Sequence, residues 1–468
     1  MDSVPPKHLQ GLPRPPLLKA LYTFLTRPIL EAIETEHWPL LFEHGSLVTW
    51  FVGNWWVVIS DPEQIRVILM DQSLADKLLY TELSPLALVG EYIGVNVLYS
   101  KGETWRRHRK VIGPAFHREW NPAPFGRWAQ VAVEQIALQG NVAVDIHPII
   151  SGMTLDALGE AVMGFTFNAT RNPKGEYALE YHRAAAAVSN NLYFLFPFLE
   201  SWPIPWRIQD RKAVRHFRDL TRRILKTKQQ CLGSGKEDLL SMMLNANADD
   251  QLLDDDELIN NTILMFAAGH DTTANTLCFT LYHLARNSKV QEEARSHIIS
   301  SLGITTFPEQ PTIPTKAQAA KMTYLDAVSL ECMRLSPSLP QMRRHLKKSH
   351  SLPDGTILPA NTLVLLQIFT AMNDPKYWHN PQEFNPARFL DGPALSRETQ
   401  RNFFGFGNGT RSCIGFQMSL MEQKITLAII LQKFSLSLPP DSIHHHRLIT
   451  TKDQLCRPVN LKILFTPI

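Results

Sequence analysis

The chain has 468 residues, with 47 lysines and arginines against 44 aspartates and glutamates, and 44% of its residues are hydrophobic. This length allows between one large domain and about three of ~150 residues, and it provides a large core without disulfide or metal staples. Charged residues make up 19% and aromatic residues 9%, which is typical of a globular protein and not of a disordered one. The net charge of +3 is too small to indicate nucleic acid binding.

The number and spacing of the cysteines bear on the compartment of the protein. They are odd in number and widely separated, and none belongs to a CxxC pair. This pattern argues against a disulfide framework and against a zinc site, and it favours a reducing compartment. The cysteines are Cys231, Cys278, Cys332, Cys413 and Cys456.

The first 45 residues are rich in proline and indicate a lead-in that precedes the main domain. They contain no continuous apolar stretch of the kind found in a signal peptide. The segment from Leu17 to Leu30 is apolar in places, but Lys19, Arg27 and Pro28 interrupt it. It is too short and too broken to span a bilayer, so we expect residues 1–45 to hold no transmembrane anchor.

Residues 46–468 show no break in composition, and we expect them to form a single domain. Ser46 to Ser60 consists of two β-rich runs around Gly53 and Asn54, which predicts a hairpin. Beyond it helical periodicity dominates, and the stretch from Asp256 to Asn287 is apolar on most faces. Its 32 residues predict a buried helix of about 48 Å that crosses the whole domain. The expected fold class is therefore mainly α with small β-sheets.

One cysteine lies in a glycine-rich loop, FGNGTRSCIG at residues 406–415, which leads into an apolar helix expected at Gly415–Phe434. Glycines let the backbone pass close to a flat ligand and direct N–H groups towards the sulfur of Cys413. The positive end of the helix dipole favours a thiolate there, and a thiolate is a good axial ligand for haem iron. Arg411 can pair with a carboxylate such as a haem propionate. The alternative is a buried structural cysteine, the usual fate of a lone cysteine.

This loop resembles the haem-binding signature of the cytochrome P-450 family, FxxGxRxCxG. Its fixed positions are filled by Phe406, Gly409, Arg411, Cys413 and Gly415. The resemblance runs in order from the predicted hairpin to the C-terminus, about nine-tenths of the chain. It implies the cytochrome P-450 fold, a single triangular domain that holds haem b between the long helix and the cysteine loop. It also implies that Cys413 is the axial ligand of the iron and that Phe406 and Arg411 bind the cofactor.

A polar run in the middle of the long helix, AGHDTT at residues 268–273, matches the family's (A/G)-G-x-(D/E)-T-T motif. An acid and a hydroxyl in a buried helix can relay protons, and the hydroxyl of Thr272 can bond a neighbouring carbonyl and open the helix. We expect Asp271 and Thr272 to be catalytic by delivering protons to bound dioxygen, and Gly269 to leave space for the cofactor. The alternative is a polar break between two shorter helices.

An acid and a base three residues apart, Glu331 and Arg334, share one face of a predicted helix. Alone, such a pair is most often a solvated ion pair. Here it precedes the segment FNPARF at residues 384–389, and the two resemble the family's ExxR pair and its later Phe/Pro/Arg segment. The resemblance implies that Glu331, Arg334 and Arg388 form a buried structural network that holds the cysteine loop.

The basic run WRRHRK at residues 105–110 resembles the family's WxxxR motif. This implies that Trp105 and Arg109 face a haem propionate, and Arg344 is a weaker candidate for the same role. The alternatives are a solvated basic helix face and a nuclear-targeting run. The rest of this basic patch is a candidate docking surface for an acidic electron-donor protein.

The resemblance implies a haem-thiolate monooxygenase, which inserts one atom of dioxygen into an apolar substrate such as a terpenoid, polyketide, alkaloid or fatty acid. The sequence contains no GxGxxG motif and no flavin domain, so electrons must come from a separate protein. The motifs favour a eukaryotic, fungal-type member that works with an NADPH-dependent flavoprotein reductase at the cytoplasmic face of the endoplasmic reticulum membrane. We expect a monomer that binds no nucleic acid.

Members of that type usually begin with a membrane-spanning helix, and we expect none in this sequence. Either an anchoring segment is missing from it or was lost, or attachment is peripheral, and a cytosolic location is the alternative. The apolar stretch from Leu192 to Leu199, ahead of Trp202 and Trp206, is a candidate membrane contact. Its alternatives are a cover for the substrate pocket and ordinary core packing.

Two other functions compete with the monooxygenase. A haem-thiolate isomerase or dehydratase rearranges an oxygenated substrate without a reductase, and a haem sensor catalyses nothing. Neither requires a proton relay, so the intact Asp271–Thr272 pair counts against both. By family analogy, the substrate walls are Leu79–Ser100, Ala184–Trp206, the first half of the long helix and the stretch after Pro337.

Overall fold

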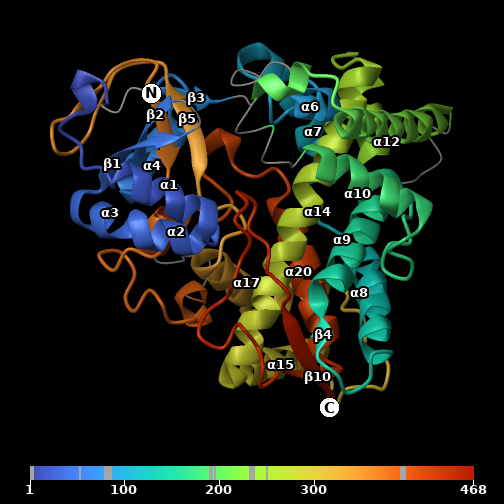
Figure 1. Ribbon diagram of the computed structural model, residues 1–468. Coiled ribbons are helices and arrows are strands. Elements are labelled where there is room, and N and C mark those ends of the chain that lie inside the picture. The colour runs from blue at the N-terminus through green and yellow to red at the C-terminus, as the bar shows by residue number, and fades with distance from the viewer. Residues whose placement is uncertain are drawn as a thin grey trace.

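A computed structural model describes residues 5–51, 54–78, 87–188, 193, 197–230, 238–248, 251–390 and 397–468. Helices fill most of the molecule, and the strands near the N-terminus gather in a lobe at the upper left of Figure 1. The long helix α14 (Asp255–Arg286), drawn in yellow-green, runs between this lobe and the helices on the right. The expected fold class, mainly helical with small sheets, is confirmed.

Within the described residues, the strands form sheets of five, three and two strands, and the order of the largest is β1-β2-β8-β5-β3. The three-stranded sheet has the order β4-β10-β9, and β6 pairs with β7. The strands are β1 (Ser46–Phe51), β2 (Asn54–Ile59), β3 (Ala75–Lys77), β4 (Val144–Asp145), β5 (Met342–Leu346), β6 (His350–Ser351), β7 (Ile357–Leu358), β8 (Leu363–Leu366), β9 (Phe434–Ser437) and β10 (Lys462–Pro467).

The predicted hairpin is present, with Ser46 opposite Ile59 and Phe51 opposite Asn54. Its turn residue Gly53 lies outside the described residues. Both faces of β2 are buried, because Val57 packs into one apolar cluster and its neighbours in the strand pack into another. The same sheet pairs β3 with β5 in antiparallel register, so two strands that are distant in the sequence lie side by side.

The helices and 3-10 turns vary in length from three residues to the 32 residues of α14. Those before α14 are η1 (Lys7–Leu9), α1 (Leu17–Thr26), α2 (Ile29–Glu36), α3 (Trp38–His44), α4 (Pro62–Met70), α6 (Leu88–Ile93), α7 (Gly102–Phe116), α8 (Pro122–Ala137), α9 (Ile146–Met163), α10 (Glu176–Val188), η2 (Pro197–Ser201), α12 (Pro205–Gln230) and α13 (Leu239–Ala248). Those after it are α15 (Ser288–Leu302), α16 (Lys316–Lys321), α17 (Thr323–Leu335), α18 (Ile368–Ala371), η3 (Pro386–Phe389), α19 (Arg397–Asn402), η4 (Gly409–Arg411) and α20 (Phe416–Leu431).

The long helix begins and ends one residue earlier than predicted, at Asp255 and Arg286. Asp254 caps it in a capping box with Glu257, and its acidic first turn and basic last turn suit the helix dipole. The helix is unbroken through residues 268–273, which excludes the alternative of a polar break between two shorter helices. It also shows that Thr272 does not open the helix in this structure.

The described part of residues 1–45, the expected lead-in, is largely helical and not an irregular connecting segment. It forms α1, α2 and α3, and Ile29 and Ile33 of α2 belong to the main apolar core. The predicted boundary at residue 46 therefore separates two segments that share one core, and the division into domains remains a prediction. Across the described residues, no helix combines the length and the apolar character that a membrane span requires.

The final helix is shorter than predicted, because α20 ends at Leu431 and Phe434 begins strand β9. Most of α20 is buried from Glu422 onwards. The short turn η4 precedes it, so Cys413 lies between η4 and the first residue of α20. The helix dipole of α20 therefore points its positive end towards the cysteine, as the sequence predicts.

Candidate cofactor site

The cysteine loop is closed by contacts within itself. The backbone N–H of Cys413 donates to the carbonyl of Phe406 at 2.8 Å, and the ring of Phe406 packs edge-on against Phe416. Cys413 is exposed by surface area, yet burial by the surrounding protein raises the pKa of its thiol, opposed by a backbone N–H bond at Gly415. The sulfur is thus accessible although protein atoms surround it on other sides. Iron, when bound, would take this sulfur as a thiolate, which requires loss of the thiol proton.

Helix α14 crosses over the start of α20 at the polar motif. Thr273 Oγ1 lies 3.0 Å from Ser419 Oγ of α20. One turn earlier, Ala268 is exposed, although α14 is buried for most of its length. Thr272 lies four residues on and shares that face, and its Oγ1 donates to the carbonyl of Ala268 at 2.7 Å. An accessible stripe of α14 with a hydroxyl on it thus lies near the cysteine loop.

Asp271 is held by a neighbour to which the motif assigns no role. Its Oδ1 lies 3.1 Å from Nδ1 of His270, a buried side chain that also contacts Ser151 (3.0 Å) and Tyr181 (3.1 Å). Burial acts to raise the pKa of Asp271, but His270 and two further histidines outweigh it, and the pKa is lowered. The acid is therefore ionised at neutral pH, and His270 is a residue that the sequence motif did not reveal.

Two glycines of the motifs allow close packing of the chain. A Cβ at Gly269 would lie 3.3 Å from the side chain of Leu158, so this glycine lets α14 and α9 approach. That Gly269 also leaves space for the cofactor stays a prediction. Gly409 has a φ of +70°, and a Cβ there would lie 2.7 Å from the carbonyl of Leu69. It lets the cysteine loop pass the end of α4.

Four predicted cofactor-binding residues from different parts of the chain come together near the cysteine loop. The guanidinium of Arg411 lies 4.1 Å over the ring of Trp105. Arg109 lies one turn after Trp105 on α7, and its charge influences both Cys413 and Arg411. Arg344 of β5 is buried, and its charge also influences Arg411.

Lys77 is a fifth cation in this group, and no motif indicated it. It lies opposite Arg344 in the register of β3 and β5. Burial and the charges of Arg344 and Arg411 lower the pKa of Lys77 to about 7. The pKa values of Arg344 and Arg411 are lowered to about 10, chiefly by burial. Asp76, 3.9 Å from Arg411, offsets part of this positive charge.

This cationic cluster, defined as Lys77, Arg109, Arg344 and Arg411, fits a ligand with carboxylates. Its members repel one another in a partly desolvated place, which an anion relieves. The Nε of Arg411 is also buried without a hydrogen-bond partner among the described residues. An accessible cysteine beside these cations fits haem, whose iron takes a thiolate and whose propionates take arginine and lysine.

The structure brings the three residues of the predicted structural network together. Glu331 and Arg334 are fully buried and form a two-pronged ion pair with distances of 2.7 and 2.9 Å. Arg334 also donates to the carbonyls of Met372 (2.9 Å) and Pro381 (2.7 Å). Arg388 is mostly buried, with its Nε 3.3 Å from Glu331. This network ties the end of α17 to the segment that leads to the cysteine loop.

A cysteine before a helix, a cationic cluster for propionates and an acid–alcohol pair on the opposing helix define a haem-thiolate monooxygenase site. The chain belongs to the cytochrome P450 family, whose family model matches residues 15–465. Haem is accordingly its cofactor, and its reaction class is that of the cytochrome P450 monooxygenases. Members of this family generally take electrons from a reductase partner and use dioxygen.

Curated relatives span most of the chain at modest identity. Cytochrome P450 4F3 of Homo sapiens is 26% identical over 430 residues, covering 83% of this chain and 78% of the relative. Cytochrome P450 4c21 of Blattella germanica is 26% identical and covers 98% and 92%. The 11-oxo-beta-amyrin 30-oxidase of Glycyrrhiza uralensis is 28% identical and covers 83% and 75%. The relatives are eukaryotic, and none of these comparisons indicates a fungal source.

The residues of this chain have separable tasks around the cofactor. Haem, when bound, supplies the binding and reductive cleavage of dioxygen. Cys413 would hold the iron, and the cationic cluster with Trp105 would hold the propionates. Asp271, kept ionised by His270, and Thr272, on the accessible stripe of α14, are the residues that would hold and pass protons. Glu331 and Arg334 would act on the position of the loop and not on the reacting atoms.

Replacing Lys77 by glutamine is expected to speed the loss of haem several-fold, because one of the cations that hold the propionates is removed. The pKa of Lys77 is lowered to about 7, and a propionate beside it raises that pKa. The haem-bound protein therefore carries more protons above pH 7, and Lys77 makes haem affinity fall as pH rises in that range. Transfer of haem to apomyoglobin at several pH values measures both effects.

Lys348 provides the control, because it is exposed and its Nζ donates to Ser73 Oγ at 3.2 Å, away from the cationic cluster. Lys348→Gln should retain haem like the wild type, with the same pH dependence. Equal haem loss and equal pH slopes for Lys77→Gln and Lys348→Gln would show that Lys77 does not face the propionates.

Proposed function

We propose that this cytochrome P450 hydroxylates a largely apolar small molecule, such as a terpenoid, polyketide, alkaloid or fatty acid. An NADPH-dependent flavoprotein reductase supplies its electrons at the cytoplasmic face of the endoplasmic reticulum membrane. The observation that carries the proposal is the pair of Asp271 and Thr272, with the acid held by His270 and the hydroxyl on the accessible stripe of α14. Neither an isomerase or dehydratase nor a haem sensor needs this pair.

Contacts of helix α6 support the predicted arrangement of the substrate walls where they are described. Helix α6 packs against α10, α12 and α14, so three of the predicted walls meet around it. The N–H of Leu88 donates to Glu200 at 3.1 Å, which joins the first wall to the second. The first part of the first wall, residues 79–86, lies outside the described residues. One relative is named for oxidation of 11-oxo-beta-amyrin, and the substrate class proposed here includes such terpenoids.

Exposed apolar side chains support peripheral contact with a membrane. On α1, Leu18, Tyr22 and Leu25 are exposed on one face of the helix, as in a helix that lies in a membrane interface. Trp202 and Trp206 are each 57% exposed, and tryptophan favours the interface. Of the predicted contact between residues 192 and 199, residues 192 and 194–196 lie outside the described residues.

The experiment that tests the function uses the purified protein with labelled dioxygen. Apolar molecules that shift the Soret band are incubated with NADPH, a flavoprotein reductase and isotopically labelled dioxygen. The expected product carries one labelled oxygen atom and forms only when all components are present. A product formed without NADPH would establish an isomerase or dehydratase instead. Binding without product or NADPH consumption, for every molecule that binds, would establish a sensor.

A further inference from the structure

A short loop, residues 94–100, lies between α6 and α7 and is held by α14 and by the cationic cluster. In its middle, the N–H of Val97 donates to Asn261 Oδ1 of α14 at 2.9 Å. Arg411 donates to the carbonyl of the same Val97 (3.4 Å) and to that of Ser100 at the end of the loop (2.9 Å). The loop therefore runs from the long helix to the cationic cluster, and its position depends on both.

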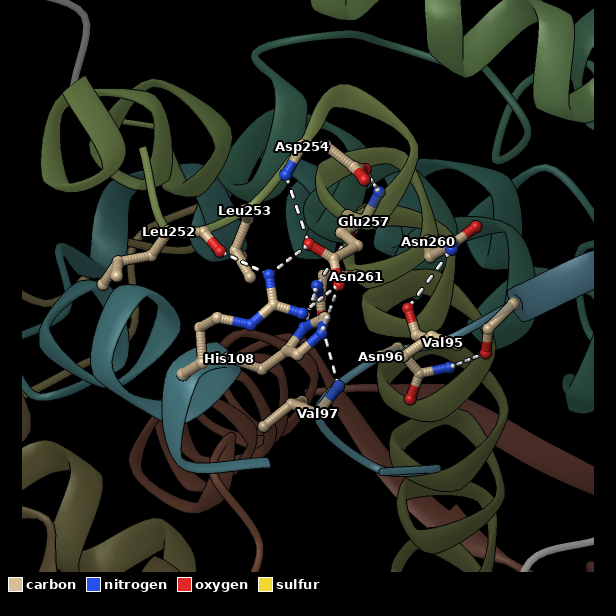
Figure 2. A network of polar contacts seen from close by, with 12 residues as sticks. Val95, Asn96, Val97, His108, Leu252, Leu253, Asp254, Glu257, Asn260 and Asn261 are labelled. Carbon is tan, nitrogen blue, oxygen red and sulfur yellow. Dashed lines mark hydrogen bonds and ion pairs between the residues drawn. The ribbon is translucent and has the colours of Figure 1, made fainter. Parts of the chain in front are cut away.

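The side chain of Asn261 is fully buried, and all of its polar atoms have partners (Figure 2). Besides the bond from Val97, its Nδ2 donates to the carbonyl of Glu257 at 2.6 Å and to Nδ1 of His108 at 2.8 Å. A buried amide with every bond made has one orientation, because any rotation leaves a donor or acceptor unpaired. Asn261 thus fixes the distance between the loop and α14.

His108 and its neighbours explain why Asn261 keeps this orientation. Because Nδ1 of His108 accepts from Asn261, the neutral imidazole carries its proton on Nε2, which lies 3.4 Å from Glu257 Oε1. Arg107 holds the same carboxylate in a two-pronged ion pair, with one distance of 2.7 Å. The backbone N–H of Asp254 also donates to it at 3.2 Å. Figure 2 shows His108 and Glu257 beside Asn261, and these contacts lock the orientation of the amide from the α7 side.

The preceding residue of α14, Asn260, holds the beginning of the same loop. Gly94 has a φ of +50°, and a Cβ on it would lie 2.3 Å from Asn260 Nδ2, so only glycine fits. Asn260 donates to the carbonyl of Val95 at 3.2 Å and accepts from Arg218 of α12 at 2.7 Å. The loop is therefore fitted against two consecutive asparagines. A residue with a side chain could not replace Gly94 without moving the loop.

The position of Asn261 on α14 connects this loop to the site. Ala268 follows Asn261 by seven residues, two helical turns, so the two share a face of α14. Ala268 is exposed and carries the carbonyl that Thr272 bonds. The loop fixed by Asn261 thus borders the N-terminal end of the accessible stripe, where the substrate lies if the proposed function is right.

We propose that Asn261 is a positioning residue that sets how far the 94–100 loop stands from α14, and that it thereby determines which apolar molecules enter the space beside the haem. The loop is one wall of that space, and its end at Ser100 is fixed by a residue of the cationic cluster. Loss of the anchor lets the wall move while the cofactor stays in place. The role in selecting substrates rests on the proposed function, whereas the anchoring of the loop by Asn261 does not.

The test compares Asn261→Leu, which has a similar volume and makes none of the bonds, with Asn261→Asp, which keeps an acceptor for the N–H of Val97. Asn275→Leu is the matched control, because Asn275 is a buried asparagine on the same helix that bonds His147 at 3.1 Å. Hydrogen exchange by mass spectrometry follows the peptide that contains the loop. Soret titrations with imidazole and with 4-phenylimidazole follow selectivity for a small and a bulky iron ligand.

In Asn261→Leu, hydrogen exchange in the loop should become about tenfold faster, the effect of losing one or two hydrogen bonds. The ratio of the dissociation constants of imidazole and 4-phenylimidazole should also change about tenfold. Imidazole itself should bind as in the wild type, and Asn275→Leu should change neither quantity. Asn261→Asp should restore part of the slow exchange of the loop and part of the ligand selectivity. If the leucine variant does not fold, the aspartate variant provides the test. Unchanged exchange in a folded variant overturns the anchor, and faster exchange with unchanged selectivity overturns the role in specificity. Neither measurement needs reductase, dioxygen or turnover, so failure of the proposed monooxygenation is recognised separately.

Discussion

Cys413→Ala is expected to abolish the strongly red-shifted Soret band that the carbon monoxide complex of the dithionite-reduced wild type shows. The shift arises because a thiolate donates electron density to the iron, and alanine offers no donor. The protein should still fold, because the side chain of Cys413 is exposed and its loop is held by the bond from its own N–H to the carbonyl of Phe406. The reduced spectrum with carbon monoxide and the far-ultraviolet circular dichroism measure the two properties.

Ser412→Ala is the matched control, since it removes one polar atom from the same turn and leaves the sulfur in place. Its carbon monoxide spectrum should equal that of the wild type. A wild-type band at the position of histidine-ligated haem, or a red-shifted band that survives in Cys413→Ala, would rule out Cys413 as the axial ligand. The monooxygenase reaction would then lack its basis, because cleavage of the oxygen bond relies on the thiolate.

The elements that the sequence predicted well are those whose signals are local. Helix α14 is within one residue of its predicted ends, because Asp254 and Glu257 form a capping box and the apolar pattern is long. The N-terminal helices were missed because prolines were interpreted as interruptions. In the structure Pro16 and Pro28 cap α1 and α2, and Pro39 lies in the first turn of α3. Proline is well suited to helix starts, where its missing N–H costs nothing.

In the candidate site too, the sequence indicates the residues that belong to local motifs and does not indicate those that only long-range packing brings there. The motifs supplied Cys413 and Arg411, which lie two residues apart in one loop. Lys77 belongs to no motif and reaches the site because β3 pairs with β5 across more than 260 residues of sequence. His270 fills the unspecified position of its motif, and its bond to Tyr181 of α10 is visible only in three dimensions. Register and helix packing decide such roles, and composition does not encode them.

Glu331→Gln is expected to destabilise the fold more than any surface substitution, because it leaves the Arg334 guanidinium buried without its counter-charge. Both side chains have no exposed area, and the carboxylate also accepts from the N–H of Asn385 at 2.9 Å. Removing one member of a buried ion pair costs about 3–5 kcal/mol. The loss should appear as a lower urea midpoint and, since Phe389 beside Arg388 packs on Phe403 ahead of the cysteine loop, as less haem bound.

Two further variants separate the buried charge from the loss of one contact. Arg388→Gln removes a cation that is 13% exposed and 3.3 Å from Glu331 but leaves the central pair intact, so its midpoint should fall less than half as far. The double variant Glu331→Leu/Arg334→Leu removes both charges. Its loss of stability should be smaller than the sum of the losses of Glu331→Leu and Arg334→Leu measured separately, because no uncompensated charge remains buried. Additive losses would show instead that each residue acts independently through its own bonds to the backbone. In that case the pair is not the element that couples α17 to the cysteine loop.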